Sequence, residues 1–201
     1  VRDGDCRWRD IALLLRNGQS YHDLIRTIFH DYGIPIFIDM KDTMLHHPLI
    51  ELIRSALETL NTNWRYEPVL RTIKTELLFP MDADHKEMRL QVDQLENYVL
   101  SRGIKGDRWT DGNRWTYRKF RGLELEERGQ TDQERMVEDE INTMRDLFRE
   151  PLMRLQNRCK KAKAGVDYCR ALYLFLEEVR VPEKLERMFA AAKERGDIAY
   201  S

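Results

Sequence analysis

The sequence predicts a mainly α-helical protein in which a short βαβ fragment, residues 1–40, precedes a helical region, residues 41–201. Two short apolar runs flank one amphipathic helix before residue 40, whereas from residue 48 onward apolar side chains recur at helical spacing. Prolines also stand where helices of the second region would begin or end. We therefore expect two structurally different parts.

The first forty residues have the pattern of one strand–helix–strand unit. Residues 11–15 form a continuous apolar run that ends at Arg16, as a buried parallel strand entering a turn would. Residues 21–32 carry apolar side chains at helical spacing, and Gly33 supplies the stop. Residues 34–38 predict a second strand. Because one such unit cannot bury both faces of its strands, we expect a fragment of a larger α/β domain.

The remaining residues predict a series of helices interrupted by one long irregular segment. Pro48 stands at the first position of a helix over residues 48–60. Further helices are predicted over residues 66–78, 85–101, 131–163, 166–180 and 182–195. Pro80 ends the second helix, Pro151 is expected to kink the long one, and Pro182 begins the last. Residues 102–130 hold five glycines without a sustained period and predict a loop or irregular subdomain.

Composition excludes several classes of protein. Charged residues make up 34%, above the usual roughly 25%, yet 34 Lys and Arg nearly cancel 35 Asp and Glu. A uniformly basic nucleic-acid binder and an acidic disordered chain are both excluded, so a binding surface must come from local segregation of charge.

No apolar run approaches the roughly 18 residues of a membrane span, and no signal peptide opens the chain. Three cysteines without CxxC spacing fit a reducing cytoplasm. Because the chain begins at Val1 in mid-pattern, we expect a piece of a larger protein.

The irregular segment contains the main candidate site. Residues 102–121 carry seven basic side chains against two acidic ones: Arg102, Lys105, Arg108, Arg114, Arg118, Lys119 and Arg121. Trp109, Trp115, Tyr117 and Phe120 are interleaved with them. Guanidinium groups pair with phosphate oxygens, and aromatic rings can stack on bases, so the segment predicts contact with nucleic acid. The alternative is a solvated loop whose tryptophans anchor it to the helices.

Two further clusters carry weaker signals. A second basic run consists of Arg154, Arg158, Lys160, Lys161 and Lys163. A separate stretch over residues 124–140 is acidic, so basic and acidic residues are segregated along the chain. Such a run is either a second DNA-facing surface or an ordinary solvated helix face.

Asp82, Asp84 and His85 would suit a metal ion, but either aspartate is also a natural N-cap for the helix that follows, and we assign no metal site. Neither a GxxxxGK[ST] phosphate loop nor a GxSxG turn is present, so the segment alone is expected to be catalytically inactive.

Several sequence motifs resemble those of a known family. The stretches DIALLLRNGQS at residues 10–20, GIPIFI at 33–38 and PLIELI at 48–53 follow one another as in superfamily 1 DNA helicases of the UvrD/RecB type. Residues 44–55, 63–67, 74–80, 91–98 and 103–106 extend the likeness. Together they are most similar to the AddB family, the helicase-like subunits of AddAB ATP-dependent helicase–nucleases.

The resemblance implies both the domain organisation and the function. Residues 1–40 would belong to the second RecA-like (2A) motor domain, and residues 41–201 to its helical 2B insertion. Such proteins work with an AddA-like motor and nuclease subunit on DNA in double-strand break repair and recombination, and help recognise the Chi sequence. ATP, magnesium and an iron–sulfur cluster would be bound elsewhere in the parent protein. Two functions remain open for this segment: DNA handling without catalysis, or a purely structural insertion that contacts the partner subunit.

The resemblance also adds two residues to the candidate DNA site. Arg16 and Asn17 lie at the turn where these helicases grip a single strand, although Leu15 replaces the usual aromatic residue and the turn is one residue shorter. The full candidate set is Arg16, Asn17, Arg108, Trp109, Arg114, Trp115, Arg118, Lys119 and Arg121.

Overall fold

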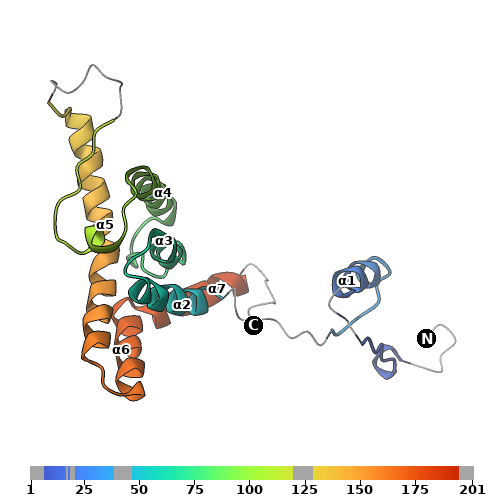
Figure 1. Cartoon of the computed structure of the whole chain (residues 1–201). Helices are drawn as coiled ribbons and strands as arrows, with labels where there is room; N and C mark the ends of the chain where they lie inside the picture. The colour runs from blue at the N-terminus through green and yellow to red at the C-terminus, as the bar shows by residue number, and fades with distance from the viewer. Residues whose placement is uncertain (1–6, 17, 19–20, 39–46, 120–128, 195–201) are drawn as a thin grey trace. The chain divides into compact units, whose positions relative to one another are not determined.

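A computed structural model describes residues 7–16, 18, 21–38, 47–119 and 129–194 of the chain. It divides the chain into two compact units, residues 1–44 and 45–201, each of which is described by itself (Figure 1). The described residues form α-helices and two short 3₁₀ turns, with no β-strand among them. The predicted mainly α class is therefore confirmed, whereas the assignment of the two parts to a motor domain and its insertion stays a prediction.

In the first unit, the helix is found but the strands are not. The 3₁₀ turn η1 covers Trp8–Asp10 and the helix α1 covers His22–Asp31. Gly33 follows α1 with a positive φ of 62°, a conformation that glycine adopts without strain, and so ends the helix as predicted. Residues 11–15 and 34–38 are described without strand hydrogen bonds, so the predicted βαβ pairing is absent from the described residues.

The physical reason lies in what a strand requires. A helix closes its own hydrogen bonds, whereas a strand needs a neighbour to accept and donate along its edge. Neither segment has such a neighbour among the described residues, and several of their apolar side chains remain in solvent: Leu14 is 93% exposed and Phe37 90% exposed.

The second unit contains the six other helices: α2 (Pro48–Asn61), α3 (Tyr66–Lys74), α4 (His85–Arg102), α5 (Asp132–Lys161), α6 (Gly165–Glu178) and α7 (Val181–Glu194). Their starts follow local signals. Pro48 is the first residue of α2, as predicted. The Asp84 carboxylate accepts the Lys86 N–H at 2.8 Å and caps α4, and Thr131 with Glu134 forms a reciprocal capping box on α5. α5 continues through Pro151.

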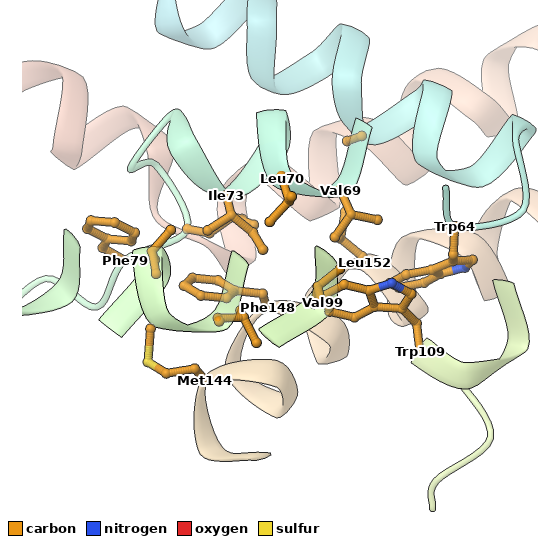
Figure 2. Close-up of a cluster of buried hydrophobic side chains, with 14 of the residues drawn as sticks. Trp64, Val69, Leu70, Ile73, Phe79, Val99, Trp109, Met144, Phe148 and Leu152 are labelled. Carbon is orange, nitrogen blue, oxygen red and sulfur yellow. The ribbon is translucent and has the colours of Figure 1, made fainter. Parts of the chain in front are cut away.

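The core lies where α3, α4 and α5 meet, with α2 against α3 and α6 against α5 (Figure 2). Met88, Val92, Leu95 and Val99 of α4 are buried, and their spacing of three and four residues places them on one face of the helix. Phe148 of α5 has no exposed surface and packs against Phe79, with ring centroids 6.1 Å apart. Burying a side chain of this size contributes about 1.5–3 kcal/mol, so the buried apolar cluster as a whole stabilises the packing of the helices.

Candidate nucleic-acid interface

The irregular segment is anchored by its tryptophans. α4 ends at Gly103, which is in the left-handed region (φ 58°), and the short turn η3 (Gly106–Trp109) then places the Trp109 indole against Trp64 at 6.4 Å between ring centroids. Trp109 is 1% exposed and Trp115 5% exposed, and their rings meet edge to face at 5.0 Å. Both predicted stacking residues are therefore core residues.

Trp115 also lacks a free ring face. The Tyr98 ring stacks against it with centroids 5.6 Å apart, and the Arg145 guanidinium lies 5.0 Å from the indole centroid. A base cannot stack on an indole ring that other side chains of the protein already cover. Burial favours the anchoring alternative for Trp109 and Trp115, and their contact with nucleic acid stays a prediction.

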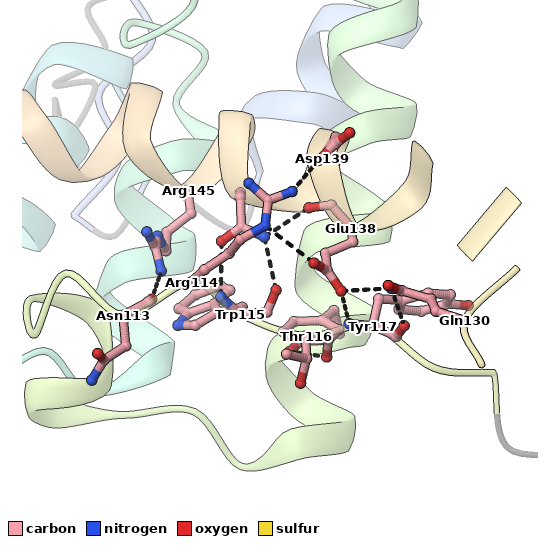
Figure 3. Close-up of polar contacts among 11 residues, drawn as sticks. Asn113, Arg114, Trp115, Thr116, Tyr117, Gln130, Glu138, Asp139 and Arg145 are labelled. Carbon is pink, nitrogen blue, oxygen red and sulfur yellow. Dashed lines mark hydrogen bonds and ion pairs between the residues drawn. The ribbon is translucent and has the colours of Figure 1, made fainter. Parts of the chain in front are cut away.

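Residues 113–119 form an extended segment that α5 holds through side chains rather than through a partner strand (Figure 3). The Asn142 side chain accepts the Trp115 N–H at 2.9 Å and donates to the Trp115 carbonyl at 2.8 Å, as a neighbouring strand would. Arg145 donates to the Asn113 carbonyl at 2.6 Å. Further along, Glu138 accepts the Tyr117 N–H at 2.8 Å and Glu134 accepts the Lys119 N–H at 3.1 Å.

The register of this docking follows from the two backbone periods. Alternate residues of the extended segment are about 6.6 Å apart, and residues one turn apart on a helix are separated by about 5.4–6 Å. Residues 134, 138, 142 and 145 of α5 stand on one helix face at that spacing, so each can reach the next odd-numbered residue of the segment. On the opposite side, the Tyr98 hydroxyl donates to the Thr116 carbonyl at 2.9 Å. The segment is consequently fixed between α4 and α5.

Glu138 is the electrostatic centre of this network. Besides the Tyr117 N–H, its carboxylate accepts Gln130 at 2.7 Å and Arg114 at 3.1 Å. Burial, the largest single influence, raises the pKa of Glu138, but the three hydrogen bonds together outweigh it and hold the pKa below its ordinary value. Arg114, predicted to bind phosphate, pairs with Glu138 and also with Asp139. Its charge is therefore already compensated within the protein.

Five other cations of the segment are exposed and take part in no ion pair with any described residue: Arg102, Lys105, Arg108, Arg118 and Lys119. Hydrogen bonds to backbone carbonyls gather three of them at the carboxyl end of α4. Arg108 donates to the Arg102 carbonyl at 3.1 Å, and Arg102 donates to the Arg118 carbonyl at 3.5 Å. We call Arg102, Lys105, Arg108, Arg118 and Lys119 the α4-end cation cluster.

The other predicted DNA contacts have different positions. Arg16 is exposed and belongs to the first unit. Asn17 and Arg121 lie outside the described residues, as does Phe120. The described members of the candidate set thus fall into three groups: buried anchors, one compensated arginine, and exposed cations that have no carboxylate partner among the described residues.

The second basic run packs against a neighbouring helix. Arg154 donates to Glu178 of α6 at 3.3 Å, and Arg158 donates to the same carboxylate at 3.1 Å. Lys160, Lys161 and Lys163 are exposed. The two arginines therefore clamp α6 to α5, while only the lysines at the end of α5 remain as solvated charge.

Neither a metal centre nor a membrane helix is found in the described part of the chain. Asp84 has the capping role that the sequence offered as the alternative to metal binding. No group of three His, Cys, Asp or Glu side chains placed to hold a metal ion occurs within residues 7–16, 18, 21–38, 47–119 and 129–194. None of the helices over the same ranges is long and apolar enough to cross a membrane.

Some functional residues escaped the sequence reasoning. Glu138, Asn142 and Arg145 are buried or nearly so, and position the extended segment. Their spacing of three and four residues on the predicted long helix was visible, but a polar stripe at that spacing is usually a solvated face. The signal that could have found them is the Asn142 amide between apolar residues, since a side chain in that position must find partners.

No family model matches the chain. The chain is 53% identical over 198 residues to the AddB protein of the ATP-dependent helicase/deoxyribonuclease of Geobacillus kaustophilus, covering 98% of this chain and 17% of that protein. Proteins of the same name from Bacillus cereus strain ZK and Geobacillus thermodenitrificans are each 51% identical, over 201 and 198 residues, and also 17% covered.

The predicted resemblance is therefore confirmed: along its whole length, the chain is homologous to an internal segment of the B subunits of ATP-dependent helicase/deoxyribonucleases, the AddB proteins. It spans about a sixth of the length of these curated relatives.

Proposed function

We propose that this chain is a non-catalytic, DNA-handling segment of a helicase–nuclease subunit that acts in double-strand break repair and recombination. In this proposal, residues 1–40 are part of the second RecA-like motor domain and residues 41–201 are its helical 2B-like insertion. The partner is an AddA-like motor and nuclease subunit, and DNA is the substrate of the complex. ATP, magnesium and an iron–sulfur cluster belong to other parts of the assembly.

The observation that carries the DNA-handling role is the α4-end cation cluster. Several exposed cations elsewhere in the second unit, among them Arg71, Arg89 and Arg154, have carboxylates within ion-pair distance. Lys105, Arg118 and Lys119 have no such partner among the described residues, so a phosphate would meet a charge without displacing an acid. The rigid docking of residues 113–119 keeps the backbone that carries Arg118 and Lys119 in place.

The exposed apolar side chains of the first unit support the motor-domain assignment. Leu13, Leu14 and Phe37 are 60%, 93% and 90% exposed, and they lie on the two segments that the sequence predicts as strands. Because buried parallel strands are apolar on both faces, such segments fit a sheet whose other strands are supplied by the rest of a larger domain.

A salt series tests the DNA role. Affinity for a short duplex and for its single strand is measured by fluorescence anisotropy between about 50 and 200 mM salt, where four phosphate contacts would cost about 150-fold in affinity. Replacing Lys105, Arg108, Arg118 and Lys119 with Ala should flatten the slope of log affinity against log salt by about 3.6. The matched control replaces four exposed lysines outside the cluster: Lys160, Lys161, Lys163 and Lys193. Equal effects of the two quadruple variants would contradict the proposal.

A second candidate function, a structural insertion that contacts the partner subunit, rests on different contacts. Burial of Trp109 and Trp115 and the clamp of Arg154 and Arg158 onto Glu178 show that much of the aromatic and basic character of the sequence serves packing. If the cluster variant leaves DNA affinity and slope unchanged while its circular dichroism stays that of the parent chain, this second function replaces the first.

A further inference from the structure

A pocket of about 260 Å³ opens between the segment that joins α3 to α4 and the helix α7. Part of its lining is apolar: Leu77 and Phe79 belong to the core and are 2% and 1% exposed, whereas Met188 of α7 is 45% exposed. This volume is below the roughly 300–1,000 Å³ of most small-molecule sites. It suits one or two amino-acid side chains rather than a cofactor.

Lys184 is the most unusual group of the pocket. Its ammonium donates to the Leu77 carbonyl at 2.8 Å and to the Val179 carbonyl at 2.5 Å. An ammonium has three N–H donors, so one is left over after these two bonds. Burial lowers the pKa of Lys184 to about 8; the nearby Arg180 adds to this, and Glu183 opposes it. The site thus holds a half-buried cation that its surroundings do not fully compensate.

The pocket contains too few carboxylates for its cations. Arg89, Lys184 and Arg187 line it, against Glu76 as the acidic lining residue. The Glu76 carboxylate already accepts two hydrogen bonds from Arg89 and lies 3.1 Å from His85 Nδ1. Arg187 donates one hydrogen bond, to the Met81 carbonyl at 2.9 Å, which leaves most of its donors unused within the described structure. A second carboxylate would reduce this excess of positive charge.

We infer that this pocket binds an acidic residue next to an apolar one, presented by a segment of a partner protein. The carboxylate would accept from Lys184 and Arg187, and the apolar side chain would cover the exposed part of Met188. The excess of positive charge in the pocket favours an acidic side chain. The apolar part of the lining favours a peptide segment over a nucleic-acid phosphate, whose neighbours are polar sugars. This site is separate from the α4-end cation cluster, so either can fail without the other.

Nuclear magnetic resonance of the 201-residue chain tests the inference with a defined probe, the acetylated and amidated leucine–glutamate dipeptide. We expect millimolar binding, with shifts at the backbone amides of Leu77, Phe79 and Met81. Saturation should also raise the pKa of Lys184, measured at its ε-carbon, because a bound carboxylate stabilises the charged form. The corresponding leucine–glutamine dipeptide should bind at least about tenfold more weakly, the loss expected for a charged hydrogen bond.

Variants locate the interaction. Arg187→Gln and Lys184→Met should each weaken the dipeptide about tenfold, whereas Lys193→Met, an exposed lysine of the same helix, should not. Because Lys184 also binds two carbonyls of the fold, Arg187→Gln decides the matter if Lys184→Met fails to fold. Equal binding of the two dipeptides, an unchanged pKa of Lys184, or no effect of Arg187→Gln would each overturn the inference. So would tighter binding of inorganic phosphate or a short oligonucleotide at the same amides, which would make the pocket a phosphate site.

Discussion

Two regions of the second unit, residues 102–119 and residues 154–163, look alike in the sequence because both are rich in arginine and lysine. In the structure they differ. Arg154 and Arg158 pair with one carboxylate of α6, whereas Lys105, Arg118 and Lys119 have no carboxylate partner among the described residues. Paired and unpaired cations occur even within residues 102–119, because Glu138 and Asp139 compensate the charge of Arg114. A count of charges therefore does not identify a binding surface; their pairing does.

The comparison also separates two uses of aromatic residues. Trp109 and Trp115 stand among basic residues, as in many single-strand binders, yet they anchor the extended segment from inside the core. If that is their role, changing them should affect folding first, and DNA affinity only through folding.

The largest effect is expected for Trp109→Ala. Removing a large, fully buried aromatic side chain costs about 3–5 kcal/mol of unfolding free energy, because it loses apolar burial and leaves a cavity. Denaturant unfolding monitored by circular dichroism measures it. Trp8→Ala is the control, because Trp8 is 43% exposed and lies in the other unit. A loss of DNA affinity at unchanged stability would restore the stacking role of Trp109.

The second largest effect is expected for Asn142→Ala. The Asn142 side chain makes two hydrogen bonds to the Trp115 backbone and one to the Glu138 carbonyl, at 2.7 Å, and it is 5% exposed. Its loss leaves buried backbone groups without partners, and we expect a cost of about 2–3 kcal/mol. Asn157→Ala, at an exposed position of the same helix, should change the unfolding free energy by less than about 0.5 kcal/mol. Similar values for the two variants would show that α5 does not hold the segment.

These effects indicate which parts of the structure the sequence could predict. Helix boundaries were readable because their causes are local: Pro48, Asp84 and Gly33 act on residues next to them. Docking of the extended segment joins Trp115 to Asn142, 27 residues away, and no periodicity reports such a contact. The compensation of Arg158 depends likewise on Glu178, 20 residues away. The sequence could not show which cations of residues 102–121 lack a carboxylate partner, since the partners of a charge depend on tertiary contacts.

The pH dependence of stability tests the electrostatic centre of the docking. The folded-state pKa of Glu138 is lower than its ordinary value of about 4.3, so its contribution to stability is complete above that pH and is lost as the pH falls through the lower, folded value. Compared with Glu138→Gln, the parent chain should therefore lose more unfolding free energy between pH about 5 and about 3. Chemical denaturation at a series of pH values measures the difference. Parallel pH curves for the two proteins would contradict a compensating role of Glu138.

The smallest effect is expected where the two basic regions differ most directly. Arg158→Ala removes a partly exposed ion pair with Glu178 and should cost no more than about 1 kcal/mol. Since Arg158 is already compensated, the slope of log DNA affinity against log salt should stay the same. Arg118→Ala should leave the unfolding free energy nearly unchanged, because the Arg118 side chain is exposed and has no ion-pair partner among the described residues, yet lower that slope by about 0.9, one phosphate contact. If Arg158→Ala and Arg118→Ala gave the same slope, internal pairing would not decide which cations contact DNA. A phosphate could then displace Glu178 from Arg158 as easily as it displaces water from Arg118.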